Sequence, residues 1–155
     1  MIEGKYLSGK DDLSQIYELR REVLQQELGM PAELDLDGQD EWAVHAIACQ
    51  GQMTAAVGRI LFDGERYIIS HVAVRGELRR QGYGDFVVRL LINRALLAGA
   101  LELYADALSA GGQALLEKIG FVPCGEPQES GGLHFVPMCL KKERLHKCCN
   151  HDTKI

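Results

Sequence analysis

The first half of the chain has a hydrophobic pattern that predicts one helix and several short strands. Residues 2–7 fit a first strand, and apolar residues recur at helical spacing over 13–24, after Asp11 or Asp12, either of which suits an N-cap. The breaker Gly29-Met30-Pro31 ends this helix. Three antiparallel strands are then expected at residues 44–49, 53–62 and 67–74.

The second half predicts a long amphipathic helix between further strands. Apolar residues recur at spacings of three and four over 83–98, and Gly99 stops the helix. A strand is expected at 101–105, and Ser109 suits the N-cap of a short helix that ends at Gly120 in the left-handed conformation. The last strands are expected at residues 121–124 and 133–140.

This order of elements predicts a mixed α/β fold. The connection from strand 67–74 through the long helix to strand 101–105 should be a right-handed crossover between parallel strands. The other strands favour antiparallel pairing, so we expect a central, twisted, mostly antiparallel sheet flanked by helices. A length of 155 residues suits one domain, which we place at 1–143, followed by a polar C-terminal tail at 144–155.

A basic, glycine-rich segment lies where strand 67–74 gives way to the long helix. It reads Arg79-Arg80-Gln81-Gly82-Tyr83-Gly84. The unpaired N–H groups and the positive dipole end of a helix N-terminus bind anions, and glycine lets the backbone approach a bulky phosphate. A dinucleotide fingerprint would need a third glycine at Val87, and the Gly-Lys-[Ser/Thr] of a Walker A loop is absent. The alternative is a purely structural role, in which this segment is a basic turn that caps a helix and binds no anion.

The pattern Arg-x-x-Gly-x-Gly resembles the coenzyme A pyrophosphate loop of the GNAT superfamily of N-acetyltransferases. The run His71-Val72-Ala73-Val74 before it and the segment 115–121 after it, Leu-Leu-Glu-Lys-Ile-Gly-Phe, fit the same superfamily. The residues from Arg21 to Asp40 look like its ElaA-type branch. The resemblance covers residues 5–140 and implies a GNAT-like fold with acetyl-CoA as co-substrate and no metal.

The resemblance also implies which residues bind the coenzyme. Backbone N–H groups of the loop would hold the pyrophosphate, and the backbone of Val72 and Val74 would pair with pantetheine, although both valines also suit ordinary core packing. The coenzyme-binding residues are therefore expected to be Val72, Val74, Arg79, Arg80, Gln81, Gly82, Tyr83, Gly84 and Ser109.

The implied reaction transfers an acetyl group to a primary amine of a small molecule or peptide. An alkylammonium titrates near ~10.4, so its deprotonation needs a base or a desolvating pocket. Ile68 and Ser70 stand where family members often place a base, and strict strand alternation would point His71 to the wrong side. Glu27 and His134 remain as catalytic candidates, although each also suits a structural role.

One departure from the family pattern leaves a second function open. The tyrosine that commonly protonates the leaving thiolate falls at Leu116, so Ser109 or water would have to replace it. The alternative function is a weakly active or inactive acyl-CoA-binding module that acts as a sensor or interaction protein.

Composition narrows the partners. A net charge of −5 argues against a nucleic-acid partner. No apolar stretch is long enough for a signal peptide or a membrane span, so we expect a cytoplasmic protein. A homodimer is left open. Five cysteines without a secretory signal favour reduced thiols, and adjacent Cys148 and Cys149 favour an exposed tail over a metal site. The acidic run over 33–41 suits either a solvated loop or a rim that attracts an amine.

Overall fold

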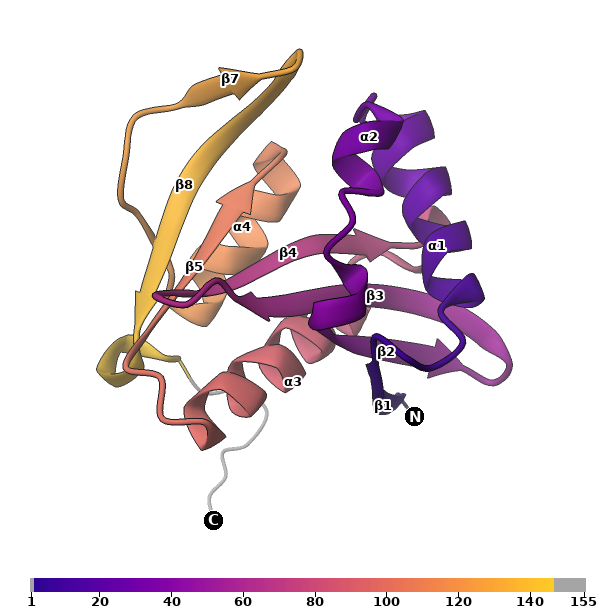
Figure 1. Ribbon diagram of the computed structural model, residues 1–155, viewed down its shortest axis with the longest axis horizontal. Helices are drawn as coiled ribbons and strands as arrows, with labels where there is room; N and C mark the ends of the chain where they lie inside the picture. The colour runs from indigo at the N-terminus through magenta and orange to yellow at the C-terminus, as the bar shows by residue number, and fades with distance from the viewer. Residues whose placement is uncertain (1, 147–155) are drawn as a thin grey trace.

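The computed structural model describes residues 2–146, which form one eight-stranded sheet with helices on both faces (Figure 1). The strands are β1 (Glu3–Ser8), β2 (Val44–Gln50), β3 (Met53–Phe62), β4 (Tyr67–Val74), β5 (Glu102–Ala107), β6 (Val122–Pro123), β7 (Gln128–Ser130) and β8 (Leu133–Lys141). The helices are α1 (Ser14–Arg20), α2 (Ala32–Asp35), α3 (Tyr83–Leu97) and α4 (Ala110–Ile119). A π-helical segment, η1 (Arg21–Glu27), continues α1, and short 3₁₀ turns are η2 (Asp40–Trp42), η3 (Gly76–Leu78) and η4 (Lys142–Arg144).

The sheet has the mixed, mostly antiparallel topology predicted from the sequence. Its strand order is β1-β2-β3-β4-β5-β8-β6, with β7 paired to β8. The pair β4–β5 is parallel, and the other described pairs are antiparallel. Both the fold class and the parallel crossover through α3 are therefore confirmed.

Two hydrophobic clusters lie on opposite faces of the sheet. The larger cluster joins α3 and α4 to the sheet, and the smaller one joins α1 to β2, β3 and β4. The predicted stripe of α3 is buried at Tyr83, Val87, Leu91 and Ala95. These two layers leave the β5 and β8 part of the sheet without a helix on the α1 side (Figure 1).

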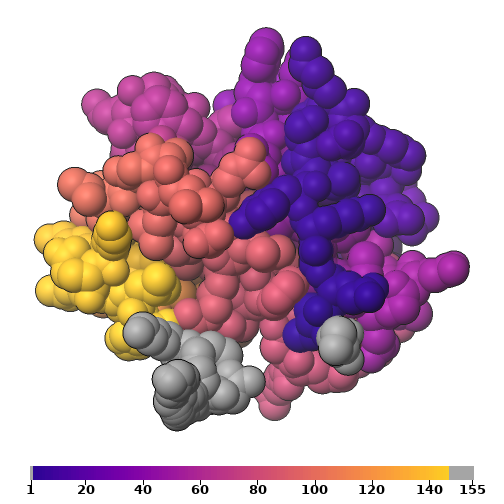
Figure 2. All heavy atoms as spheres, turned by 90° about the horizontal axis from the view of Figure 1, so that it is seen from below, coloured from indigo at the N-terminus to yellow at the C-terminus, as the bar shows by residue number. Residues whose placement is uncertain are grey.

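Strand β1 contacts one side of α3. The Tyr6 hydroxyl donates to the Leu90 carbonyl at 2.7 Å, and a Cβ on Gly4 would come within 2.2 Å of the Phe86 ring. Seen from below, α3 lies between the N-terminal residues and α4 (Figure 2). Strand β1 therefore contacts α3 at Phe86 and Leu90, within the helix.

The structure departs from the predicted elements in the first helix. Residue Leu13 occupies its N-cap position without a side-chain hydrogen bond, while Asp12 accepts from the Ser14 N–H at 3.0 Å. The helix then widens, since the Leu28 N–H bonds the Val23 carbonyl five residues back. Hydrophobic periodicity did not predict α2, because its buried residue is Asp35.

The start of the predicted C-terminal tail packs on the domain. The His146 N–H donates to the Ile119 carbonyl at 2.7 Å, so residues 144–146 cover the end of α4. Cys148, Cys149 and His151 lie outside the described residues. Cys49, Cys124 and Cys139 are free thiols.

Candidate active site

Strands β4 and β5 separate after only three paired rungs. Tyr67, Ile68 and Ile69 pair with Leu103, Tyr104 and Ala105. Beyond Ile69, β4 is paired only with β3 and β5 only with β8 within residues 2–146. The β5-facing backbone of the second half of β4 is therefore open to an extended ligand that pairs with it as a further strand.

A β-bulge at His71 marks the point of separation. Arg59 on β3 pairs with Ser70, whereas Val57 pairs with Ala73, so two residues of β4 lie opposite Gly58. His71 adopts a positive φ of 56°, and such a bulge bends its strand and interrupts regular pairing.

The bulge also changes which face each residue occupies. Ser70 and His71 both point toward the α1–α2 side, where Ser70 contacts Arg59 and His71 contacts the Leu34 carbonyl. Val72 and Val74 pack against the α3 cluster. The expectation that His71 faces away from Ser70 was wrong, because strict alternation holds only for an unbulged strand.

The loop between β4 and α3 forms a cradle of backbone N–H groups. Arg80 and Gly82 have positive φ values of 63° and 92°, and alternating conformations of this kind turn successive N–H groups toward one point. No hydrogen bond within residues 2–146 uses the N–H groups of residues 80–85, and no side chain caps the helix at Gly82. The α3 dipole adds positive potential there.

Glycine is required at the two positions of the loop, Gly82 and Gly84, for different structural reasons. A Cβ on Gly82 would meet only Ile2 Cδ1, at 3.8 Å, so the left-handed conformation is what requires glycine there. A Cβ on Gly84 would lie 3.0 Å from Val74 Cγ2 and 3.2 Å from Leu115 Cδ2. Gly84 therefore lets the first turn of α3 approach β4 and α4.

The remaining loop side chains are arranged unequally around the cradle. Arg79 donates to the Val74 carbonyl at 3.1 Å and also binds Glu27. Arg80 is exposed and has no hydrogen-bond partner in the described part of the chain. Gln81 contacts the Glu77 carbonyl, and Tyr83 is buried in the α3 core. Arg80 is thus the side chain best placed to meet a phosphate.

The expected catalytic candidates lie apart from each other. Glu27 ends η1 and is half exposed beside the loop, paired to Arg79. His134 lies in the β7–β8 hairpin with its side chain 80% exposed, 3.5 Å from Glu129. No contact in residues 2–146 joins the two side chains, and Glu27 is engaged as an ion-pair partner of the coenzyme loop.

Two further expected positions are used by α4. Ser109 is its N-cap and accepts from the Gly112 N–H at 3.0 Å, as the sequence predicted. Leu116 is buried in the core with 6% exposure, so this position of α4 offers no hydroxyl to the site.

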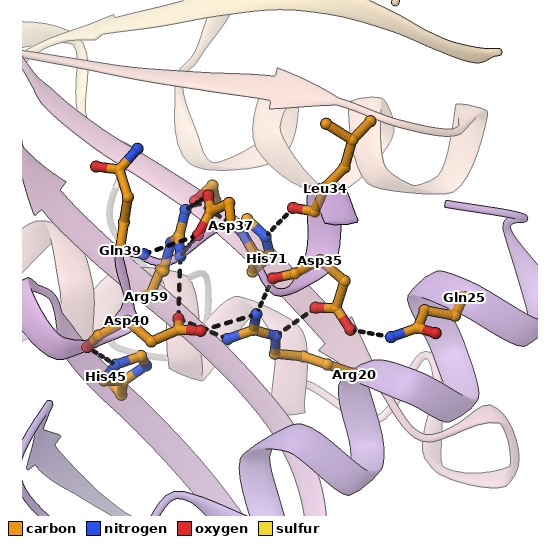
Figure 3. A network of polar contacts seen from close by, with 11 residues as sticks. Arg20, Gln25, Leu34, Asp35, Asp37, Gln39, Asp40, His45, Arg59 and His71 are labelled. Carbon is orange, nitrogen blue, oxygen red and sulfur yellow. Dashed lines mark hydrogen bonds and ion pairs between the residues drawn. The ribbon is translucent and has the colours of Figure 1, made fainter. Parts of the chain in front are cut away.

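A buried ion network lies on the α1–α2 side of the bulge (Figure 3). Arg20 binds Asp35 at 2.7 Å and Asp40 at 2.8 Å. Arg59 binds Asp37 at 2.6 Å and Asp40 at 3.0 Å, which joins the two arginines through one carboxylate. The network fixes α2 and η2 to β3 beside the site.

The network corrects the interpretation of the acidic run. Asp35 is 1% exposed and Asp40 is 6% exposed, and both face arginines, not solvent. Glu33 and Glu41 of the same run are exposed. The three aspartates therefore form neither a solvated loop nor an acidic rim. The signal in the sequence was Arg59, a charge inside the apolar strand 53–62, which needs buried partners.

Burial and nearby charge set the protonation states in this network. Burial, with the charges of Arg59 and Arg20, lowers the pKa of His71 to about 4. Burial alone would raise the pKa of Asp37, but the hydrogen bonds and charge of Arg59 lower it to about 2. Burial also lowers the pKa of His45, whose Nε2 contacts the Asp40 carbonyl at 2.9 Å. At neutral pH Asp37 and Asp40 are charged and both imidazoles are neutral.

The hydrogen bonds of His71 define its tautomer. Its Nε2 lies 3.1 Å from the Leu34 carbonyl, which only accepts, so Nε2 carries the proton. Its Nδ1 then accepts from the Ser70 hydroxyl at 2.9 Å, while the Ser70 oxygen accepts from Arg59 Nε at 3.0 Å. His71 therefore joins α2 to the bulge and has no open nitrogen with which to deprotonate a substrate.

A pocket of about 300 Å³ lies next to the strand separation, on the sheet face that no helix covers. Ile68 of β4 and Tyr104 and Asp106 of β5 form its floor, and the segment 124–128 and Pro137 of β8 form its walls. The β7–β8 turn contacts α2, since a Cβ on Gly131 would lie 3.3 Å from Leu34 Cδ1. Sequence reasoning named Ile68 but missed Tyr104 and Asp106, because no spacing links them to the loop.

A family profile described as acetyltransferase (GNAT) domain matches residues 31–142. The chain belongs to this GNAT acetyltransferase family. It is therefore an acyltransferase of the acetyl-CoA-dependent class, as expected. No curated protein sequence matches it.

Solved structures with the GNAT fold match nearly the whole chain. The structure of ElaA from Escherichia coli is 25% identical, with a TM-score of 0.79, and the match covers 91% of this chain and 100% of that chain. A GNAT family acetyltransferase from Elizabethkingia anophelis with acetyl-CoA bound is 17% identical, with a TM-score of 0.70 and coverages of 90% and 97%. A Bacillus subtilis acetyltransferase in complex with CoA is 19% identical, with a TM-score of 0.68 and coverages of 90% and 99%.

Two other properties follow from the described residues. Within residues 2–146, no group of three or more metal-ligating side chains is close enough to hold an ion. No helix in the same range is long and apolar enough to cross a membrane.

Proposed function

We propose that this GNAT protein transfers an acetyl group from acetyl-CoA to the primary amine of a small molecule or peptide. One observation carries the proposal: the N–H cradle at residues 80–85 and the open backbone edge of β4 are consecutive along the chain. A pyrophosphate in the cradle and a pantetheine arm along Val72 and Val74 would bring the thioester to the strand separation. Two similar structures hold CoA or acetyl-CoA, which supports acetyl-CoA as the co-substrate.

The pocket beside the strand separation suits the acceptor. A neutral amine that enters there attacks the thioester carbonyl, the new C–N bond forms as the C–S bond breaks, and the nitrogen releases its extra proton to water. The sulfur leaves as a thiolate, which is a tolerable leaving group because thiols titrate near ~8.5. A β4 backbone N–H that the separation leaves open is the donor for the developing oxyanion. Leu116 therefore does not forbid turnover.

The same residue gives the second candidate function its support. Without a hydroxyl at Leu116 or a base at Ile68 and Ser70, the site also suits a binding module that holds acetyl-CoA without transfer. The two candidates differ only in turnover.

Calorimetric titration with acetyl-CoA, followed by a thiol-release assay with a panel of amines, tests both. Binding with amine-dependent release of CoA is the expected result. Binding without release above buffer, across the whole panel, would establish the binding module. Absence of binding would overturn both candidates.

A further inference from the structure

The pocket beside the strand separation carries opposite charges at its two ends. Register places Asp106 level with Ser70, one step past the last β4–β5 pair, and Arg66 at the other end, just before β4. Ile68 and the Tyr104 ring form the floor between them. Asp106 therefore lies at the end where a thioester would emerge.

The Asp106 carboxylate is available to a ligand. It has no ion-pair or hydrogen-bond partner among residues 2–146. Its surroundings desolvate it and raise its pKa, while the charge of Arg66 lowers that pKa slightly. Asp106 itself is exposed, so its unpaired carboxylate is accessible to a cation.

The Arg66 guanidinium is held in place but is not neutralised. It lies over the Tyr104 ring, 5.0 Å from its centroid, while the Tyr104 hydroxyl donates to Glu102 at 2.6 Å. Its ion pair with Asp63 is long, at 3.7 Å, and exposed. One oxygen of Asp63 already accepts the backbone N–H groups of Glu65 and Arg66. Such a pair contributes little, so Arg66 keeps its capacity for an anion.

The spacing of the two charges limits the ligand. Tyr104 and Asp106 are two residues apart on one face of β5, which is roughly 7 Å along a strand. The guanidinium lies over Tyr104, so the cationic and anionic ends of a ligand would be separated by a short chain. A pocket of about 300 Å³ has room for a small molecule of that length.

We propose that the acetyl acceptor is a small amine that carries an anionic group a short chain away, with Asp106 binding its ammonium and Arg66 its anionic group. The inference rests on the proposed function. In the reaction the ammonium loses one proton through Asp106 to water, the freed lone pair forms the C–N bond, and the nitrogen then releases a second proton to water to give the neutral amide. The C–S electron pair leaves with the CoA thiolate.

Matched amines test this assignment in the thiol-release assay. 4-Aminobutyrate, 4-aminobutanamide and butylamine carry the amine on the same four-carbon chain, and only 4-aminobutyrate has a negative charge at the other end. We expect kcat/KM for 4-aminobutyrate to exceed that for the other two at least tenfold. The ratio should fall toward one in Arg66→Gln, and Asp106→Asn should lower kcat/KM for all three amines.

Arg94→Gln is the matched control, because Arg94 also lies over a tyrosine ring, 5.1 Å from that of Tyr6, but belongs to α3 and does not line the acceptor pocket. It should leave the ratio unchanged. Equal use of the three amines by the unsubstituted protein, or a preference that survives Arg66→Gln, would overturn the acceptor assignment while leaving acetyl transfer intact. Acetyl-CoA binding without release for any amine would overturn the proposed function itself, and the acceptor assignment with it.

Discussion

Arg20 and Arg59 determine how the acidic residues near the site behave. Each guanidinium is almost fully buried and binds two of the three carboxylates Asp35, Asp37 and Asp40. The carboxylates therefore act as structural anions that fix α2, and they contribute little field to an approaching amine. Sequence spacing alone gave the opposite interpretation, since a run of aspartates after a Gly-Met-Pro breaker also describes a solvated loop.

Substitution Arg59→Met tests the energetic part of this argument. It leaves Asp37 and Asp40 with less compensation in a buried site, and the expected loss in the free energy of unfolding is about 3–5 kcal/mol. Urea denaturation measures it. Arg66→Met is the exposed comparison, because its pair with Asp63 should cost less than about 1 kcal/mol. Similar losses in the two variants would show that the buried network is not a special source of stability.

His71 predicts a dependence of stability on pH. Its pKa of about 4 in the folded protein lies below the ordinary value of 6.5, so the unfolded chain binds the proton more tightly. The stabilisation is fully present above pH 6.5 and is lost as the pH falls toward 4, on the order of 3 kcal/mol in total.

His71→Gln removes that titration while an amide still reaches the Leu34 carbonyl. Denaturation at a series of pH values should give a flatter dependence between pH 4 and 6.5 for the variant. His45, whose pKa is also lowered, supplies the slope that remains. An unchanged slope in His71→Gln would contradict the neutral imidazole at the bulge.

At the scale of elements, the β4-loop-α3 unit was predictable because each part has a local cause. Gly82 at positive φ, a helix N-terminus and an apolar strand can each be inferred from the local sequence. The bulge at His71 was not predictable, because no glycine marks it and its conformation depends on contacts from α2 and β3. Helix α2 was also missed, because its buried side chain is an aspartate and hydrophobic periodicity does not reveal it.

Gly82→Ala tests the cradle at this scale. A left-handed conformation costs an L-residue roughly 1–2 kcal/mol, so the variant should bind acetyl-CoA about tenfold more weakly or worse by calorimetry. Gly64→Ala places the same strain, at a φ of 96°, in the β3–β4 turn, where no atom lies within 4 Å of the added Cβ. The control should lose stability but keep its affinity. Equal affinities in the two variants would rule out a role for the loop conformation in binding.

For the whole molecule, the sheet has room for a ligand strand between two halves that are joined at only three rungs. Strands β1 to β4 carry the α1 and α2 contacts, while β5, β8 and β6 carry α4 and the acceptor pocket. A ligand that pairs with β4 therefore adds contacts across the least connected part of the fold.

Coenzyme binding should consequently stabilise the whole protein. At a hundredfold excess over its Kd, a ligand adds about 2.7 kcal/mol, which for a domain of this size raises Tm by roughly 5–10 °C. Differential scanning fluorimetry with acetyl-CoA measures the shift, with ATP as the phosphate-bearing comparison. A shift of the same size with ATP would mean that the cradle recognises phosphate without the pantetheine arm.

The extra residue at His71 interrupts the alternation of side chains between the two faces of β4. Deleting it would restore strict alternation with Gly58 opposite Val72, so Val72 and Val74 would still face α3 while the strand would lose its bend. Lengthening the Asp63–Gly64 turn by a residue, in contrast, changes no pairing partner along β4. The separation of β4 from β5 beyond Ile69 thus depends on the bulge, whereas the length of the connecting turn can vary.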